Sequence, residues 1–172
     1  MKLQLTAIEL DTSIQCRAAI DIAVVNEYAE RMEHGDVFMP IDVYGSKTKC
    51  WLADGWHRVL AVRQNGGESI DGQLHPGGRV DALKHALGAN ALHGHRRTNE
   101  DKRRCVEIAL REFPKLSSRA VATMCGVGHE MVDAARPLAE TANATRTTTD
   151  GRQYPASRRV VPTRATSVQQ GL

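Results

Sequence analysis

Residues 1–92 mix two hydrophobic spacings, which predicts helices and strands in the same segment. Val25, Tyr28, Ala29 and Met32 recur at the spacing of one helical face, and Asp21 precedes them as a candidate N-cap. Short apolar runs between Gly, Pro and Ser predict strands. We expect strands over 8–14, 37–44, 49–53 and 70–74, and further helices over 57–64 and 80–87.

The remainder of the chain divides into two segments of different character. Residues 98–140 are rich in helix formers and predict an all-helical segment, in which Ser117-Ser118 can cap one helix and Pro137 can stop the last. Residues 141–172 are rich in Thr and Arg without sustained periodicity, so we expect this tail to be largely disordered when free. The predicted organisation is an α+β domain over 1–97, a helical segment over 98–140 and a basic tail over 141–172.

Charge is distributed unevenly along the 172 residues, although the net charge is only +3. Residues 1–92 carry 9 Lys/Arg and 12 Asp/Glu, residues 93–119 carry 8 and 4, and residues 141–172 carry 5 arginines and one aspartate. This asymmetry indicates an anionic partner for the rear half of the chain. A solvated basic face remains the alternative.

Cysteines, histidines and hydropathy exclude several classes of protein. The four cysteines form no CxxC pair, which is typical of reduced thiols in a cytoplasmic protein. The chain reaches a charge too early for a signal peptide, and it has no apolar run of the roughly 20 residues that a membrane helix needs. We therefore predict no membrane partner. The HGH sequence at 93–95, together with His75 and His85, could suggest a zinc site, but the other ligands are undefined, so we predict no metal site.

Residues 117–136 match the pattern of a DNA-binding helix-turn-helix. That motif needs a small residue on the first helix, a glycine four positions later for the turn, and an aliphatic six positions beyond on the second helix. Ala122, Gly126 and Val132 meet these requirements. The motif would place residues 128–136 in a major groove of double-stranded DNA. A helical hairpin used only for packing or dimerisation is the alternative.

Side chains around this motif are candidates for contacts to DNA. Glu130 can accept a hydrogen bond from cytosine, and His129 can donate to guanine or phosphate, but the acidic residues repel phosphate. Affinity would therefore come from basic and hydroxyl neighbours. The predicted DNA-binding residues are Lys102, Arg103, Arg104, Ser117, Ser118, Arg119, Gly128, His129, Glu130 and Arg136.

The stretch WLADGWHRVLAV, residues 51–62, predicts a strand that turns into a helix at Gly55. The N-H groups at the start of a helix attract anions, and glycine lets a ligand approach the backbone. Arg58 could grip a phosphate in a bidentate way, and His57 could donate a hydrogen bond. The alternative is an ordinary surface turn in which Asp54 caps the helix.

At this point the chain resembles the ParB/sulfiredoxin superfamily, with a ParB-like N-terminal domain followed by a helix-turn-helix. The resemblance is carried by four boxes in the same order as in the family. They are SIQCR at 13–17, DVFMPIDVYG at 36–45, DGWHRVLA at 54–61 and NALHGHRRTNEDKRRCVEIAL at 90–110.

The resemblance implies a nucleoside triphosphate site that binds CTP or ATP with magnesium, and a protein that forms a homodimer. The residues it assigns to nucleotide binding are Gln15, Arg17, Gly55, Arg58, Asn90 and either Arg96 or Arg97, and His57 joins them as the hydrogen-bond donor expected at the same turn. Trp56 stands where sulfiredoxin needs its cysteine nucleophile, so sulfiredoxin chemistry is not expected. The resemblance favours a DNA-binding regulator or partition-type protein of a phage or other mobile element.

Two other functions stay open from the sequence. One ParB-like branch phosphorylates free serine and has Asp-Gly-His-x-Arg where this chain has Asp54-Gly55-Trp56-His57-Arg58. Asp54 could then act as general base or magnesium ligand in a nucleotide-dependent kinase or nuclease. The other alternative is a protein-interaction module that keeps the fold without either ligand.

Overall fold

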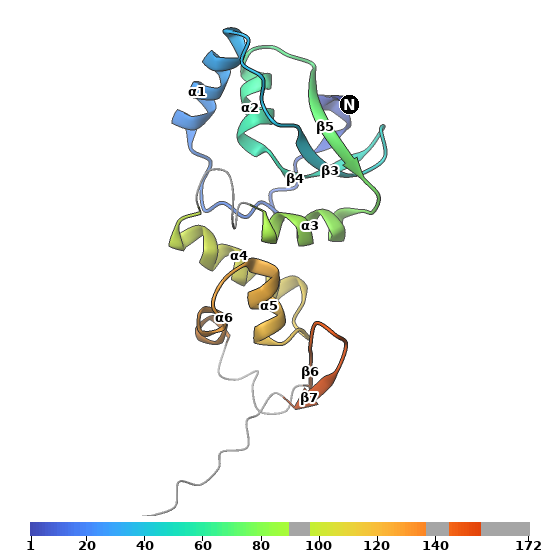
Figure 1. Cartoon of the computed structure of the whole chain (residues 1–172), viewed down its shortest axis with the longest axis vertical. Coiled ribbons are helices and arrows are strands. Elements are labelled where there is room, and N and C mark those ends of the chain that lie inside the picture. The colour runs from blue at the N-terminus through green and yellow to red at the C-terminus, as the bar shows by residue number, and fades with distance from the viewer. Residues whose placement is uncertain (90–96, 137–144, 156–172) are drawn as a thin grey trace, which may run out of the picture.

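A computed structural model of the chain describes residues 1–89, 97–136 and 145–155 (Figure 1). The expected residues Asn90, Arg96 and Pro137 lie outside this described part. The helices are α1 Ile22–Glu33, α2 Trp56–Gln64, α3 Arg79–Gly88, α4 Asn99–Glu112, α5 Ser118–Cys125 and α6 His129–Ala135, with a 3-10 turn at Leu5–Ala7. The strands are β1 Lys2–Gln4, β2 Ile8–Glu9, β3 Ile41–Gly45, β4 Cys50–Asp54, β5 Ser69–His75, β6 Thr145–Thr147 and β7 Gln153–Pro155.

The first five strands form a mixed sheet in the order β1-β5-β3-β4-β2. β3 runs parallel to β5 and antiparallel to β4, while β1 is antiparallel to β5 and β2 is parallel to β4. The predicted α+β class is therefore confirmed. The strand expected over 8–14 is wrong beyond Glu9, because the chain turns at Asp11, whose carbonyl accepts from the Ile14 N-H.

Side chains alternate between the two faces of this sheet, which separates two parts of the core. Ile41, Val43 and Leu52 pack with Val59 of α2 in one cluster. Ala53 and the partly buried Tyr44 pack on the opposite side with Leu83 of α3. Each strand of the pair β3–β4 thus presents one face to α2 and the other to α3, and both faces are covered.

Helix α1 forms as its sequence predicts and packs on α2. The Asp21 carboxylate accepts from the N-H groups of Ala23 and Val24 at the start of the helix. At the other end Gly35 has φ 88°, which suits the expected left-handed residue after a helix. Val25 and Ala29 of α1 then bury against α2.

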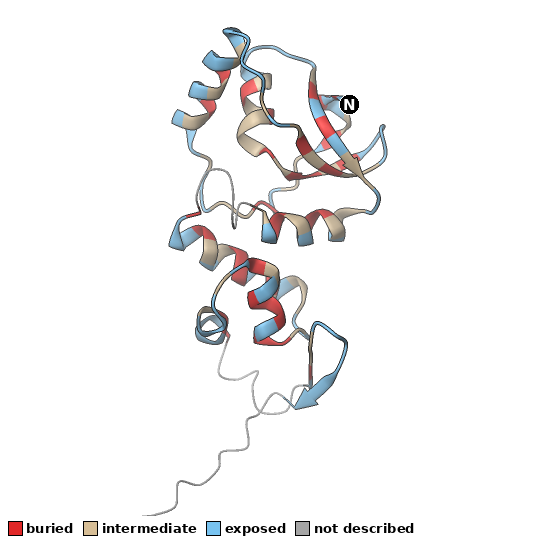
Figure 2. Ribbon diagram, viewed as in Figure 1, coloured by how far each residue is buried: buried red, intermediate tan, exposed pale blue. Residues whose placement is uncertain are grey.

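The helices α4, α5 and α6 share one hydrophobic cluster with α3, so packing is continuous across residue 97, where a domain boundary was predicted. Leu83 of α3 lies in the same cluster as Val106 of α4, Val121 of α5 and Val132 of α6. Figure 2 shows buried positions along the sides of α3, α4 and α5 that face one another. Burial of this kind contributes about 1.5–3 kcal/mol for each large aliphatic side chain.

Part of the tail predicted to be disordered is ordered. β6 and β7 pair as an antiparallel hairpin, and Gly151 takes φ 85° in the turn between them. The Thr147 N-H donates to the Lys115 carbonyl at 2.7 Å, and the Ser117 N-H donates to the Thr147 carbonyl at 2.8 Å. The hairpin therefore docks on the segment that leads into α5, which local periodicity could not predict.

Within the described residues, no helix is long and apolar enough to cross a membrane.

Candidate functional site

A cavity of about 550 Å³ opens where β4 ends, beside the start of β3 and the start of α2. Its walls come from segments far apart in sequence, which the sheet brings together. Among the residues that line it are Arg17, Tyr28, Phe38, Gly55, His57 and His85. The volume lies in the range of small-molecule sites, which span roughly 300–1,000 Å³.

Gly55 forms the turn between β4 and α2 and is the N-cap of α2, as the sequence predicts. Its φ of 109° is one that L side chains rarely adopt, and an added Cβ would lie 2.4 Å from Cγ2 of Ile41. The first turn of α2 thus borders the cavity with its positive dipole end. The turn expected from the sequence is therefore present, and its attraction for an anion stays a prediction.

Arg58 differs from its expected role, because its guanidinium is engaged in the cavity wall. Nη1 donates to the carbonyls of Met39 and Pro40 at 2.5 and 2.7 Å, and Nη2 donates to Asp54 Oδ2 at 2.7 Å. These bonds tie the segment before β3 to the end of β4. Arg58 therefore shapes the cavity in this structure, and its fork does not present a bidentate phosphate grip.

Asp54 also lies in the wall rather than standing apart as a general base. The Asp54–Arg58 ion pair spans one turn at the start of α2, and the aspartate side chain is 26% exposed. Asp54 lines the cavity, so it faces any ligand bound there. The N-cap of α2 is Gly55, so the alternative role of Asp54 as a helix cap stays a prediction.

Arg17 and His57 both line the cavity and are held by neighbours on other elements. Arg17 Nη1 lies 3.2 Å from Oδ2 of Asp101 at the start of α4. The Nε2 atom of His57 accepts from the Asp21 N-H at 3.3 Å. Both residues keep a position beside the cavity that suits contact with an anion.

Two other residues assigned to nucleotide binding serve packing in this structure. Gln15 is buried, and its backbone carbonyl accepts a hydrogen bond from Nε of Arg104 at 3.1 Å. Arg97 is also buried, and its guanidinium donates to the carbonyls of Leu87 and Cys125 at 3.0 and 2.7 Å. Arg97 thus joins α3 to α5, and the assignment to a phosphate is not supported by this geometry.

Cys16 is the cysteine that borders the cavity. Its hydrogen bond with Cys105 and its burial raise the pKa of the Cys16 thiol well above the ordinary value. The thiol therefore stays protonated at neutral pH, and a protonated thiol is a weak nucleophile. Cys16 therefore does not substitute for the cysteine nucleophile of sulfiredoxin, whose position Trp56 occupies in this chain.

The cavity also borders a cluster that the sequence did not reveal. Asp42 of β3 and His85 of α3 line the cavity, and His75 lies at the end of β5. His75 Nε2 lies 2.7 Å from Asp42 Oδ1, and Nδ1 of His85 lies 3.1 Å from the Tyr44 hydroxyl. From the sequence both histidines could be named but not connected with Asp42, because only the sheet register and the packing of α3 bring the three residues together.

The helices α5 and α6 form the predicted helical pair around a left-handed turn. Gly126 has φ 60° and ψ 47°, and its N-H donates to the Thr123 carbonyl at 3.3 Å. Ala122 and Val132 are both buried where the two helices meet. The small residue, the turn glycine and the aliphatic therefore occupy the positions that their spacing predicts.

Three residues expected to contact DNA are instead buried in this helical pair. Ser117 is the N-cap of α5 and accepts from the Ala120 N-H. The Ser118 hydroxyl accepts from Nε of Arg136 at 3.2 Å, and Arg136 also donates to the Leu116 carbonyl. Ser118 and Arg136 therefore hold the two helices together, and Ser117 caps the first turn of α5, because their polar groups are satisfied inside the pair.

The other expected DNA-binding residues lie at or near the surface. Glu130 stands next to His129, whose Nδ1 lies 3.4 Å from Glu130 Oε1. Lys102 and Arg104 are half-buried, and Nε of Arg104 donates a hydrogen bond to the backbone carbonyl of Gln15. The exposed members of the set are Arg103, Arg119, Gly128, His129 and Glu130.

No family model and no curated protein match the chain, but solved structures do. The chromosome-partitioning protein ParB from Caulobacter crescentus, complexed to the centromeric parS site, aligns with TM-score 0.52 and 12% identity over 78% of this chain and 69% of that chain. The same protein complexed with CTP-gamma-S aligns with TM-score 0.48 and 13% identity over 78% and 75%. Sulfiredoxin from Arabidopsis thaliana aligns with TM-score 0.42 and 21% identity over 49% and 93%.

In this chain a mixed sheet with its covering helices precedes a helical segment. Identities this low report on backbone architecture, and they leave the function of individual residues to be argued from this chain. The chain has a ParB/sulfiredoxin-like fold.

Proposed function

We propose that this chain is a ParB-like DNA-binding protein that binds a nucleotide in its cavity, a regulator or partition-type protein of a phage or other mobile element. The observation that carries the proposal is the α5–α6 pair, in which Gly126 makes the turn and Val132 locks the second helix. DNA-binding helix-turn-helix motifs also join two short helices by a tight turn, which supports the proposal. The Caulobacter ParB of similar fold is complexed to parS DNA, which makes duplex DNA the first partner to test.

In this proposal α6 enters the major groove and basic residues around it hold the phosphates. His129 and Glu130 lie on its exposed side and can read base edges. Arg119 is exposed in the first turn of α5, and Lys115 is exposed beside the β6–β7 hairpin. The hairpin itself adds Arg152, which is exposed and lies 3.3 Å from Asp150. We also propose a homodimer, because helix-turn-helix dimers bind paired half-sites.

The cavity supports the second half of the proposal. Arg17 and His57 line it together with the first turn of α2, so positive charge and backbone dipoles meet in one space. Aromatic side chains of Tyr28, Phe38 and Trp56 line the same cavity and offer surfaces for a base. A nucleoside triphosphate, CTP or ATP with magnesium, combines these two chemical requirements.

Duplex binding tests the DNA half directly. Fluorescence anisotropy with a mixed-sequence duplex, repeated over a range of salt concentrations, measures affinity and its salt slope. Replacing both Arg103 and Arg119 by alanine should lower the salt slope by about 2, since each lost phosphate contact lowers it by about 1. The control is Arg63→Ala, an exposed arginine at the end of α2. Unchanged binding in the double variant would remove the basis of the DNA proposal.

Thermal unfolding tests the nucleotide half. A ligand that binds the native state raises the unfolding midpoint, by an amount equivalent to about 2.7 kcal/mol when its concentration is 100 times Kd. CTP, ATP, GTP and UTP should be compared, each with magnesium. The cavity is supported as the site if one nucleotide raises the midpoint of the wild type and does not raise the midpoint of Arg17→Ala above that variant's own value without nucleotide. No rise with any of the four contradicts it.

An enzyme that uses Asp54 is the second candidate, because the carboxylate lines the cavity beside the proposed phosphate region. It would be a nucleotide-dependent kinase or nuclease. Magnesium-dependent turnover that Asp54→Asn abolishes would favour this function over simple binding. Because Asp54 also pairs with Arg58, the variant must first be shown to unfold at the same temperature as the wild type.

A further inference from the structure

Three ligand-type side chains from three separate elements converge beside the cavity. Asp42 lies on β3, His75 at the end of β5 and His85 on α3. One oxygen or nitrogen atom from each lies within 4.8 Å of the other two, and all three residues are half-buried.

The sheet register explains why two of them share a face. β3 and β5 are parallel, and Tyr44 pairs directly with His75. Their rings stack at a centroid distance of 4.9 Å and an interplanar angle of 25°. Asp42 lies two residues before Tyr44 and therefore on the same face of the sheet. The His75 imidazole is thus positioned between Tyr44 and the Asp42 carboxylate.

Helix α3 supplies the third member and its supporting contact. The His85 Nδ1 atom lies 3.1 Å from the Tyr44 hydroxyl. When Nδ1 carries the proton and donates to that hydroxyl, Nε2 keeps its lone pair toward Asp42, whose Oδ2 lies 3.9 Å away. A hydrogen bond from the other ring nitrogen is the support that metal-bound histidines regularly have.

We propose that Asp42, His75 and His85 bind a divalent transition metal ion of the zinc class. Two imidazole nitrogens and one carboxylate oxygen suit zinc and its neighbours, whereas magnesium and calcium prefer oxygen ligands. Bonds of about 2.0–2.2 Å require the ligand atoms to lie roughly 3–3.6 Å apart in tetrahedral geometry. His75 Nε2 lies 2.7 Å from Asp42 Oδ1 and His85 Nε2 lies 3.9 Å from Asp42 Oδ2, and one ligand atom from each residue lies within 4.8 Å of the others, so side-chain rotations must bring the three to one metal ion.

The metal would keep an open position toward the cavity. Three protein ligands leave a fourth position for water or an anion, as in catalytic zinc sites. Asp42 and His85 both line the cavity of about 550 Å³ that also contains Gly55 and His57. A bound metal would therefore place positive charge in the same cavity that the first turn of α2 borders. The site requires neither DNA nor nucleotide, so it does not depend on the proposed function.

Metal titration of the full-length chain, without a polyhistidine tag and after treatment with a chelator, tests the site. Zinc binding is measured by calorimetry, and cobalt binding by visible absorption. One equivalent should bind, and His75→Ala and His85→Ala should each weaken binding at least about tenfold. Tyr44→Phe should weaken binding without abolishing it, since loss of a supporting contact costs about 10–100-fold. The control variants are His34→Ala and His129→Ala, which are exposed and lie outside the cluster.

Three results would overturn the proposal. The first is the absence of stoichiometric binding by the wild-type chain. The second is binding that survives both His75→Ala and His85→Ala, which would place the metal elsewhere. The third is binding lost in Cys16→Ser and kept in the histidine variants, which would indicate thiolate ligands. Circular dichroism of each variant shows whether the fold persists, and Asp42→Asn keeps the shape of the side chain while removing its charge.

Discussion

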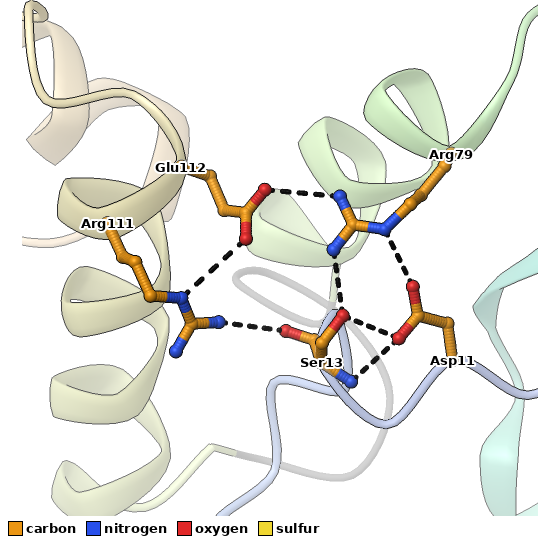
Figure 3. Close-up of polar contacts among 5 residues, drawn as sticks. All are labelled: Asp11, Ser13, Arg79, Arg111 and Glu112. Atoms are coloured by element: carbon orange, nitrogen blue, oxygen red, sulfur yellow. Dashed lines mark hydrogen bonds and ion pairs between the residues drawn. The ribbon is translucent and has the colours of Figure 1, made fainter.

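Arg79 at the start of α3 and Glu112 at the end of α4 form an ion pair in which Nη1 and Oε2 are 3.1 Å apart. The same guanidinium donates from Nε to Asp11 at 2.7 Å and from Nη2 to the Ser13 hydroxyl at 2.7 Å (Figure 3). One side chain therefore joins the loop after β2 to both helices. Arg111 adds a second link, with Nη2 3.3 Å from the Ser13 carbonyl.

Arg79→Ala should lower the free energy of unfolding by about 1–3 kcal/mol, because it leaves hydrogen-bonded, half-buried carboxylates without their partner. Urea denaturation measures the change, with Arg63→Ala as the exposed control. A double-mutant cycle with Glu112→Gln separates the contribution of the ion pair. Equal stability of Arg79→Ala and Arg63→Ala would show that the network contributes nothing.

Asp101 should make the protein sensitive to acid. Burial raises its pKa, but hydrogen bonds from the Ala18 and Thr98 N-H groups and the charge of Arg17 outweigh burial and lower the pKa below the ordinary value. A carboxyl whose pKa is lower in the folded chain stabilises the fold above its unfolded pKa of about 3.9, and this stability is lost as the pH falls toward the folded pKa.

Asp101→Asn should therefore reduce stability at neutral pH and flatten the fall in stability below about pH 4. Chemical denaturation at closely spaced pH values measures both effects. The hydrogen bond from the Ala18 N-H to Asp101 Oδ1 is 2.8 Å long and can persist to an asparagine oxygen, so the variant should fold. An acid limb identical to that of the wild type would contradict the assignment.

Gly55 should tolerate substitution far less well than another glycine with positive φ. In Gly55→Ala the new Cβ would lie 2.4 Å from Ile41 Cγ2, in addition to the backbone strain at φ 109°. Gly66 has φ 69° with nothing within 4 Å of its added Cβ. Gly66→Ala should cost about 1–2 kcal/mol from left-handed strain alone, and Gly55→Ala should cost clearly more. Similar losses in both variants would mean that the clash relaxes freely.

Patterns of local origin were predicted well from the sequence. The apolar spacing of α1, its Asp21 cap and the left-handed Gly35 all depend on residues close in the chain. Gly55 and Gly126 were identified in the same way, because a turn needs a residue that accepts positive φ. The ParB/sulfiredoxin-like fold followed from several such local features in a fixed order.

Features that depend on distant residues were not predicted. The β6–β7 hairpin is stabilised by Lys115 and Ser117, which precede it by about thirty positions, so its own sequence gives no periodic signal. Arg97 and Arg136 were read as ligand contacts because sequence shows charge and not burial. Both are less than a tenth exposed and bind backbone carbonyls.

Arg58 connects the fold to the proposed nucleotide site. Arg58→Lys separates the hydrogen bonds that its guanidinium makes in the cavity wall from its positive charge. Lysine keeps the positive charge, but one ammonium group cannot reach the carbonyls of Met39 and Pro40 and the Asp54 carboxylate in the fixed geometry of a guanidinium. If Arg58 shapes the cavity wall, Arg58→Lys and Arg58→Ala should both lose about 1–3 kcal/mol of stability and both weaken nucleotide binding. Denaturation and thermal shift with nucleotide measure the two effects together. If Arg58→Lys kept both stability and binding, charge alone would be its contribution, and the wall formed by Met39, Pro40 and Asp54 would not depend on the guanidinium.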